Sequence, residues 1–260
     1  MRLVVKKDYN EAARWTADYI VEKINKHTGP GPFRLGLPTG SSPLGVYREL
    51  VAMHRAKKVS FADVVTFNMD EYLGLPADHP QSYHRFMWDN FFSHVDIRKE
   101  NVHILDGMAR DPEAECEAYD REASEGGFDL FLGGVGQNGH LAFNEPGSSP
   151  RSRTRVITLT ADTRTVNARF FEGDADKVPE KALSVGMGTV LDAKEVLIII
   201  TGYNKARALK AAVEGGICQM WPISFLQTHP KGIIVCDGEA VEELTVGTLR
   251  HFRGIEGISP

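Results

Sequence analysis

This sequence has few cysteines, no long apolar run and no excess of basic residues. The three cysteines, Cys116, Cys218 and Cys236, are far apart and odd in number, which is typical of reduced thiols and not of a disulfide framework or a zinc cluster. No stretch reaches the roughly 18 consecutive apolar residues of a membrane span. With a net charge of −5, the chain also lacks the basic footprint of a nucleic-acid-binding protein. We therefore expect neither a membrane nor a nucleic acid as a partner.

The beginning of the chain lacks a long apolar core as well. Residues 1–8 read MRLVVKKD, without the apolar segment of a secretory signal, so we expect a cytoplasmic protein. Apolar residues make up 42% of the 260 residues and charged residues 25%. This length and composition fit a single large domain, residues 1–260, with a substantial core.

The sequence does contain a regular alternation of apolar strands and amphipathic helices. The patterns predict strands at residues 33–37, 64–68, 128–132, 195–201 and 232–236. They predict helices at residues 9–26, 43–55, 79–92, 111–125, 204–214 and 238–248, with Ser42 as the N-cap of the second. Such alternation is typical of a Rossmann-like three-layer α/β/α fold with a mostly parallel central sheet, whose active site lies outside the carboxyl ends of the strands.

The most informative segment follows the strand predicted at residues 128–132. Residues 132–147 read LGGVGQNGHLAFNEPG, so a glycine-rich turn leads into Asn138, His140 and Glu145. A histidine paired with a carboxylate can move protons on and off a substrate oxygen. The alternative interpretation is structural, with glycines that only relieve φ constraints in a tight loop.

This segment also matches the dinucleotide-binding pattern Gly-x-Gly-x-x-Gly at Gly134, Gly136 and Gly139. A true fingerprint opens a helix and has an acidic residue about 20 positions later. Here Pro146 and Gly147 follow almost at once, so we expect no nicotinamide cofactor. The nine histidines show no His-Glu-x-x-His or similar spacing, and we expect no metal.

A second loop, residues 36–43 with the sequence GLPTGSSP, follows a predicted strand and opens a helix. Its small residues let backbone N–H groups approach an oxyanion, and the helix N-terminus favours negative charge. Thr39, Ser41 and Ser42 add hydroxyl donors, although the Gly-Lys-Ser/Thr of a Walker loop is absent. The sequence therefore predicts a phosphate cradle, and a simple capped turn is the alternative.

A third loop carries two adjacent carboxylates, Asp70 and Glu71, at the end of the strand predicted at residues 64–68. In an extended or turning segment the two side chains point apart, so we expect only one to face the site. Partial burial would raise the pKa of a carboxylate that abstracts a C–H proton. The alternative is that one of them caps the next helix or meets solvent.

Two basic residues complete the predicted site. Arg169 lies in the segment NARFF, and Lys205 follows the strand predicted at residues 195–201. Each could meet a phosphate, which arginine binds bidentately. The alternative for each is a solvated surface charge.

Together these loops resemble the glucosamine-6-phosphate deaminase family, whose members are also called glucosamine-6-phosphate isomerases. The resemblance covers nearly the whole chain, and its most specific motifs are residues 35–43, 65–72, 133–146, 152–155 and 167–171. It implies conversion of glucosamine 6-phosphate and water to fructose 6-phosphate and ammonia, in amino-sugar catabolism and without a redox cofactor. It also implies a homo-oligomer, with a hexamer favoured although monomeric members exist, and a mobile helical lid at about residues 151–185.

The resemblance implies a role for each matching residue. Asp70 would take the C2 proton of the opened sugar and return a proton to C1 through an enolamine. His140, oriented by Glu145 and Asn138, would assist ring opening. The implied substrate-binding residues are Ser41, Ser42, Arg169 and Lys205 for the phosphate, and Thr39, Gly40, Tyr72 and Gly134 for the rest of the substrate.

The chain departs from the family pattern at Asn138, where many members carry aspartate. Because asparagine cannot ionise, we expect the imidazolium of His140 to be less stabilised here than beside a carboxylate.

A second departure concerns an effector site. Some members are activated by N-acetylglucosamine 6-phosphate at a subunit-interface site built from a serine, an arginine, a lysine and a tyrosine. Ser148 and Arg155 match the first two, whereas Ile157 and His251 replace the lysine and the tyrosine. Losing the lysine removes a charge partner for phosphate, so we expect weak or absent activation.

Two other functions fit the same scaffold. A 6-phosphogluconolactonase is similar in fold and also has a Gly-His element after a glycine loop, but it uses no aspartate base on C2. Residues 68–72 and 143–146 favour the deaminase. A non-catalytic sugar-phosphate sensor needs only phosphate and hydroxyl contacts, so the presence of Asp70, His140 and Glu145 together argues against it.

Overall fold

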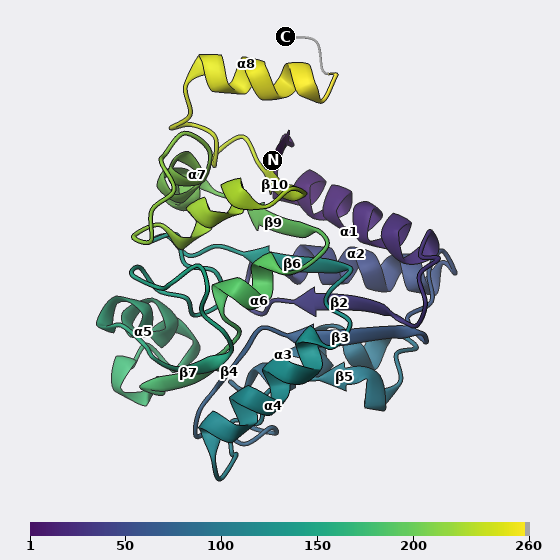
Figure 1. The fold of residues 1–260 in the computed structure, drawn as a ribbon, viewed down its shortest axis with the longest axis vertical. Coiled ribbons are helices and arrows are strands. Elements are labelled where there is room, and N and C mark those ends of the chain that lie inside the picture. The colour runs from purple at the N-terminus through teal and green to yellow at the C-terminus, as the bar shows by residue number, and fades with distance from the viewer. Residues whose placement is uncertain (258–260) are drawn as a thin grey trace.

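Seven parallel strands form the central sheet of the protein (Figure 1). The structure, a computed structural model, describes residues 1–257. In spatial order the strands of this sheet are β1 (Arg2–Val5), β10 (Gly232–Cys236), β9 (Val196–Ile200), β6 (Leu130–Gly134), β2 (Phe33–Leu37), β3 (Val64–Asn68) and β5 (Val102–His103). Every neighbouring pair is parallel. The predicted mostly parallel sheet is therefore confirmed.

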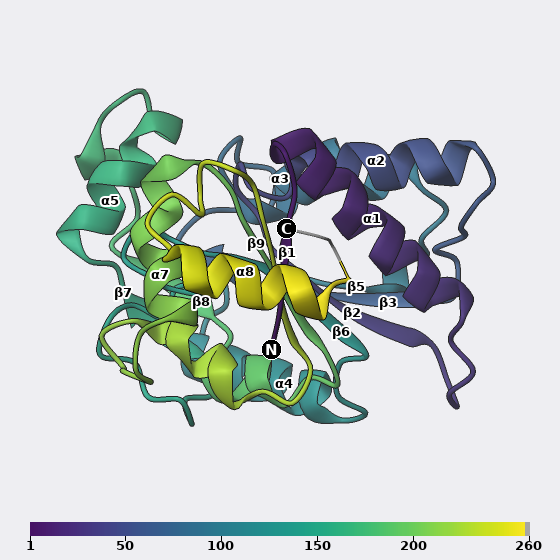
Figure 2. The same ribbon diagram turned by 90° about the horizontal axis from the view of Figure 1, so that it is seen from above.

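Helices cover both faces of the sheet, as Figure 2 shows for α1 and α2 on one side and α4 on the other. One face is packed by α1 (Tyr9–Asn25), α2 (Leu44–Arg55) and α3 (Tyr83–Asn90), and the other by α4 (Pro112–Ser124), α6 (Met187–Leu191) and α7 (Ala206–Val213). The final helix, α8 (Val246–Ile255), contacts the edge strand β1. These layers confirm the expected three-layer α/β/α fold.

The alternation of side chains along each strand explains why both faces are apolar. On β9, Leu197 and Ile199 pack into the core beneath α1 and α2, whereas Ile198 and Ile200 pack into the core beneath α4 and α7. A strand that is buried on both faces reads as a continuous apolar run, as this one does. The predicted bounds of β2, β3 and β10 match the structure at both ends.

A second, three-stranded antiparallel sheet lies beside the first and was not expected from the sequence. Its strands are β4 (Asp70–Tyr72), β8 (Lys181–Ser184) and β7 (Arg155–Thr158). Between β7 and β8 lie helix α5 (Ala161–Asn167) and the 3₁₀ turns Ala168–Phe170 and Ala175–Lys177. The segment predicted as a helical lid at about residues 151–185 is therefore framed by two strands. We call α5 and these two turns the lid segment.

The predicted helix at residues 238–248 is wrong. Helix α8 begins only at Val246, because the Thr245 side chain caps it and accepts a hydrogen bond from the Thr248 N–H at 3.3 Å. The preceding residues form turns in which the Asp237 carboxylate accepts from the Ala240 N–H at 2.9 Å. The apolar periodicity of Ala240, Val241 and Leu244 thus comes from buried turns.

The predicted N-cap at Ser42 is also wrong. Helix α2 begins at Leu44, and no side chain of the preceding Pro43 caps it. Instead the Tyr9 hydroxyl accepts a hydrogen bond from the Gly45 N–H at 2.7 Å. This contact leaves the Ser42 hydroxyl available for another partner.

The other predicted helices and strands differ from the structure at their ends only, whereas no prediction covered β1, β5 or α6. Strand β6 lies two residues later than expected, and α3 is shorter because Ser82 caps it. Within residues 1–257, no helix combines the length and apolar character needed to cross a bilayer.

Replacing Gly186 by alanine should destabilise the fold. A Cβ at Gly186 would lie only 2.0 Å from the Ser152 carbonyl oxygen, so the segment before β7 would have to move away from α6. We expect the free energy of unfolding to fall by about 1–3 kcal/mol in denaturant titrations. The control is Gly216→Ala, whose Cβ meets nothing within 4 Å; a loss there equal to that of Gly186→Ala would contradict this account.

Candidate active site

The candidate site is built at the carboxyl ends of four neighbouring strands, β9, β6, β2 and β3. Because these strands are parallel, the loops that follow them lie at one edge of the sheet. Those loops are the segments that carry Lys205, His140, Ser42 and Asp70. In Figure 1, α5 and β7 lie at this edge. The geometry therefore gathers the loops that the sequence singled out.

Asp70 is a buried carboxylate with an unused oxygen. Its side chain is 6% exposed, and no group in residues 1–257 hydrogen bonds to its Oδ1. Burial, and after it the negative charge of Glu71, raise the pKa of Asp70 well above its usual range. Once ionised, a carboxylate in this environment is a stronger base than one in water, and its Oδ1 has no partner within residues 1–257.

Glu71 points away from Asp70 and serves the fold. Its carboxylate accepts hydrogen bonds from the backbone N–H groups of Tyr83 at 2.9 Å and His84 at 2.8 Å. It therefore holds the N-terminus of α3, where a negative charge is stabilised. The prediction that only one of the two carboxylates faces the site is consistent with this arrangement, and the helix-capping alternative applies to Glu71.

His140 and Glu145 lie close together in the loop after β6. The Nδ1 atom of His140 is 3.7 Å from Oε2 of Glu145, which is too long for a hydrogen bond but close enough for charge attraction. Burial lowers the pKa of His140, the Glu145 carboxylate acts in the opposite direction, and the charge of Lys205 lowers it further. The imidazole packs over Gly136, where a Cβ would lie 2.2 Å from its Cε1.

Asn138 acts on Glu145 and not directly on the imidazole of His140. Its Nδ2 donates to Oε2 of Glu145 at 2.9 Å, and its Oδ1 accepts from the backbone N–H of His140 at 3.3 Å. The hydrogen bond expected between Asn138 and His140 is therefore made at the backbone N–H of His140 and not at its ring. Asn138 also orients the carboxylate that faces the ring.

Two cationic side chains, from the lid segment and from the loop after β9, lie close enough for their charges to interact. Lys205 follows β9 and donates a hydrogen bond from Nζ to the Val135 carbonyl in the loop after β6. Arg169 is an exposed residue of the lid segment, stacked over Phe170 at 4.6 Å. Burial, and after it the charge of Arg169, lower the pKa of Lys205 to about 8. An anion between the two would relieve this repulsion.

The serine loop after β2 contacts the end of β6, next to Val135, whose carbonyl accepts from Lys205. A Cβ at Gly134, the end of β6, would lie 3.4 Å from the Ser42 Cβ, so the two loops are in contact. Ser41 is exposed, and Thr39, Gly40 and Ser42 are partly exposed. These residues therefore present small polar groups beside the end of β6.

Tyr9 is a supporting residue of this loop that sequence reasoning missed. Its hydroxyl lies 3.2 Å from the Ser42 carbonyl oxygen and also accepts from the N–H of Gly45. No motif marks Tyr9, because it lies on the first helix, far from the loop in sequence.

The lid segment touches the site directly, which the sequence did not reveal. Thr163 donates a hydrogen bond from Oγ1 to Oε1 of Glu145. Asn167 donates from Nδ2 to the Tyr72 hydroxyl at 2.9 Å. Asn167 begins the motif at residues 167–171, whereas no signal in the sequence distinguishes Thr163.

The four positions that correspond to the family's effector site do not all lie together within one chain. Arg155 donates to the Ser148 hydroxyl at 3.3 Å, and Ile157 lies on the same strand, β7. His251, however, lies on α8, which Figure 1 shows at the opposite end of the molecule from β7. A single chain therefore does not assemble the set.

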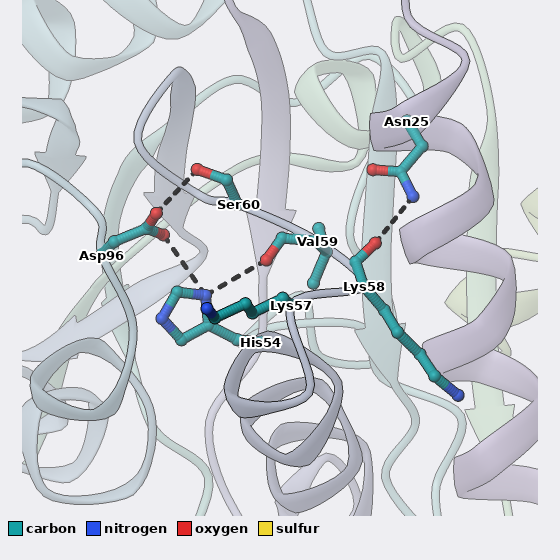
Figure 3. A pocket seen from close by; sticks show the side chains of 7 residues that line it. All are labelled: Asn25, His54, Lys57, Lys58, Val59, Ser60 and Asp96. Atoms are coloured by element: carbon teal, nitrogen blue, oxygen red, sulfur yellow. Dashed lines mark hydrogen bonds and ion pairs between the residues drawn. The ribbon is translucent and has the colours of Figure 1, made fainter.

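A surface hollow at the other edge of the sheet carries no comparable chemistry. It lies where α2 ends and β3 approaches, and Figure 3 shows its lining. Three polar side chains of the lining are already paired: Asn25 with the Lys58 carbonyl, His54 with the Val59 carbonyl, and Ser60 with Asp96. Among residues 1–257, no three His, Cys, Asp or Glu side chains gather as metal ligands.

Comparisons with known proteins agree with this geometry. Residues 7–235 match the family model described as glucosamine-6-phosphate isomerases/6-phosphogluconolactonase. A glucosamine-6-phosphate deaminase of Phocaeicola vulgatus is 61% identical over 259 residues, which cover 98% of each chain. A solved monomeric glucosamine-6-phosphate deaminase is 41% identical, with a TM-score of 0.89 over 92% of this chain and 98% of that one.

A more distant solved structure, the 6-phosphogluconolactonase of Trypanosoma cruzi, shares the fold. It is 20% identical, with a TM-score of 0.73 over 94% of this chain and 97% of that one. Fold and site thus define an enzyme of the isomerase and lactonase class. Within this class, the chain belongs to the glucosamine-6-phosphate deaminase family.

Replacing Asn138 by aspartate should raise the pKa of His140. The new carboxylate adds negative charge near the imidazole, so the limb of the pH–rate profile that follows protonation of His140 moves to higher pH. The ring can be titrated directly by NMR. Asn138→Ala is the control, because it removes the same amide from Glu145 without adding charge. An unchanged limb in Asn138→Asp would contradict the prediction.

Proposed function

We propose that this enzyme converts glucosamine 6-phosphate and water to fructose 6-phosphate and ammonia in amino-sugar catabolism. The observation that carries the proposal is the buried Asp70 carboxylate, whose free Oδ1 lies at the strand edge that also carries His140 and Lys205. The relatives named as glucosamine-6-phosphate deaminases support the choice of substrate. The cytoplasm is the expected location. A hexamer is the predicted assembly, although one solved relative is described as monomeric.

In this mechanism the protein anchors the substrate by its phosphate, which is remote from the reacting carbons. Ser41, Ser42, Arg169 and Lys205 supply hydroxyl and cationic donors, and the repulsion between the two cations favours a dianion between them. Thr39, Gly40, Tyr72 and Gly134 line the rest of the substrate. Binding energy from the remote phosphate then helps to hold C2 against Asp70.

Ring opening requires a proton to move between the ring oxygen and the hydroxyl on C1. His140 is suited to this step, because burial lowers the pKa of its imidazole and keeps the ring neutral and able to accept a proton. The nearby Glu145 carboxylate stabilises the imidazolium that forms. Asn138 keeps Glu145 in place.

Isomerisation and deamination follow on the open chain. Asp70 removes the proton from C2, giving an enolamine, and returns a proton to C1. The imine that results at C2 adds water and loses ammonia, which leaves the ketone of fructose 6-phosphate. Burial of Asp70 makes its carboxylate more basic than one in water, as abstraction of a C–H proton requires.

The direct test is incubation with glucosamine 6-phosphate, with fructose 6-phosphate and ammonium both quantified. We expect equal amounts of the two products. Asp70→Asn should lower turnover at least about a hundredfold while fructose 6-phosphate still binds in calorimetry. Undiminished turnover in the variant would remove Asp70 from its role. Absence of both products from the unmodified enzyme would favour a lactonase or a sensor instead.

Phosphate binding should weaken as the pH rises through about 8, where the buried Lys205 loses its proton. The folded-state pKa is depressed, so the charged form that attracts phosphate is present below this value and lost above it. Fructose 6-phosphate is the suitable probe, because it carries no amine. Its dissociation constant should rise by up to about tenfold per pH unit above that value. In Lys205→Arg this dependence should vanish, and a flat profile in the unmodified enzyme would contradict the assignment.

A further inference from the structure

The lid helix α5 presents two side chains to the candidate site. Thr163 and Asn167 are four residues apart and therefore lie on one face of the helix. Thr163 donates to Oε1 of Glu145, and Asn167 donates to the hydroxyl of Tyr72. Both acceptors are buried. The lid segment thus contributes hydrogen-bond donors to two groups of the site itself.

The contact with Glu145 begins at the cap of the lid helix. Thr160 is the N-cap of α5, and its Oγ1 accepts from the Thr163 N–H at 3.2 Å. The same hydroxyl donates to Oγ1 of Thr163 at 3.1 Å, and Thr163 donates onward to Glu145. Helix capping and the orientation of Glu145 therefore belong to one chain of hydrogen bonds. With seven residues, α5 is too short to be stable without contacts of this kind.

Both oxygens of Glu145 are held by neutral donors. Asn138 binds Oε2, which is the oxygen that faces His140, and Thr163 binds Oε1. If Thr163 moves away with the lid segment, Oε1 loses its partner and the carboxylate is free to turn away from the imidazole. The position of the Glu145 carboxylate, which stabilises the imidazolium of His140, therefore depends on Thr163 of the lid segment.

We propose that Thr163 is a positioning residue, which makes the pairing of His140 with Glu145 depend on the lid helix being folded over the site. Lid closure then covers the substrate and also holds Glu145 in the position from which it assists proton transfer at His140. By linkage, Glu145 stabilises the folded lid as much as the lid orients Glu145. The kinetic consequence rests on the proposed deaminase function, whereas the structural coupling does not.

The kinetic test compares Thr163→Val with Thr163→Ser. Valine keeps the shape and loses the donor, so kcat should fall about tenfold with a smaller change in KM. Serine keeps the hydroxyl and should restore kcat. The matched control is Thr165→Val, because Thr165 lies on the same helix and bonds only the Ala161 carbonyl. If KM rises as much as kcat falls, Thr163 acts only by holding the lid and Arg169, and the proposal fails.

The pH–rate profile provides a second kinetic readout. The charged groups that face His140 are Glu145, which raises its pKa, and Lys205, which lowers it. If Glu145 turns away in Thr163→Val, the limb that follows protonation of His140 should move to lower pH. An unmoved limb in this variant would overturn the proposal, as would an equal movement in Thr165→Val.

Hydrogen exchange tests the coupling without substrate. Backbone amides of residues 161–167 should exchange faster in Thr163→Val and also in Glu145→Ala, although Glu145 lies outside the lid. Unchanged exchange in Glu145→Ala would overturn the proposal even if the enzyme is an active deaminase. Faster exchange in both variants of a protein that shows no deamination would support the coupling and reject the proposed function.

Discussion

The parallel pairing of β9, β6, β2 and β3 is the constraint on which the whole site depends. Strand β6 lies between β2 and β9, so the chain changes direction across the sheet between β2 and β6. Loops that follow strands on either side of such a point diverge and leave a crevice at the carboxyl edge. The register pairs Leu35 with Leu130 and Phe131 with Val196. A slip of one residue would turn the apolar faces of these strands outward, so the core that fixes the register also fixes the site.

The adjacent carboxylates Glu71 and Asp70 differ in role, because Glu71 stabilises the fold whereas Asp70 is left without a partner on Oδ1. Glu71 lies over the N-terminus of α3, where three backbone N–H groups, including that of Tyr72, offset its burial. Asp70 is equally buried but has no such partner on Oδ1. An unpaired buried carboxylate costs free energy, and it persists because the pairing of β4 with β8 holds the backbone on which it lies. Such a violation of the rules of stable folding is typical of a functional position.

Local pattern was enough to predict five of the seven strands of the central sheet, and helices α1, α2, α3, α4 and α7, because each of those elements buries an apolar face. It failed for β1 and β5 at the two edges of that sheet, and for β4, β7 and β8. These strands are only two to four residues long, and β4 pairs with a segment more than a hundred positions away, as Asp70 does with Ser184. It also failed at the C-terminus, where buried turns imitate a helical period. The loops of the site were found from their composition, but the roles of Tyr9 and Thr163 depend on contacts between distant segments. Those contacts leave no trace in either segment alone.

Asn144 gives Arg155 a structural role within the protein. Its Oδ1 accepts from Nη1 of Arg155 at 2.9 Å, and its Nδ2 donates to the carbonyls of Leu141 and Val185. Arg155 also bonds Ser148, so its guanidinium is already engaged within the protein. These contacts hold the residue next to Glu145 and tie the catalytic loop to β7. Because Ile157 offers no charge and His251 lies on α8, an anionic effector would have to compete with these contacts with little added charge. Arg155 therefore has a structural reason to be present that does not require an effector.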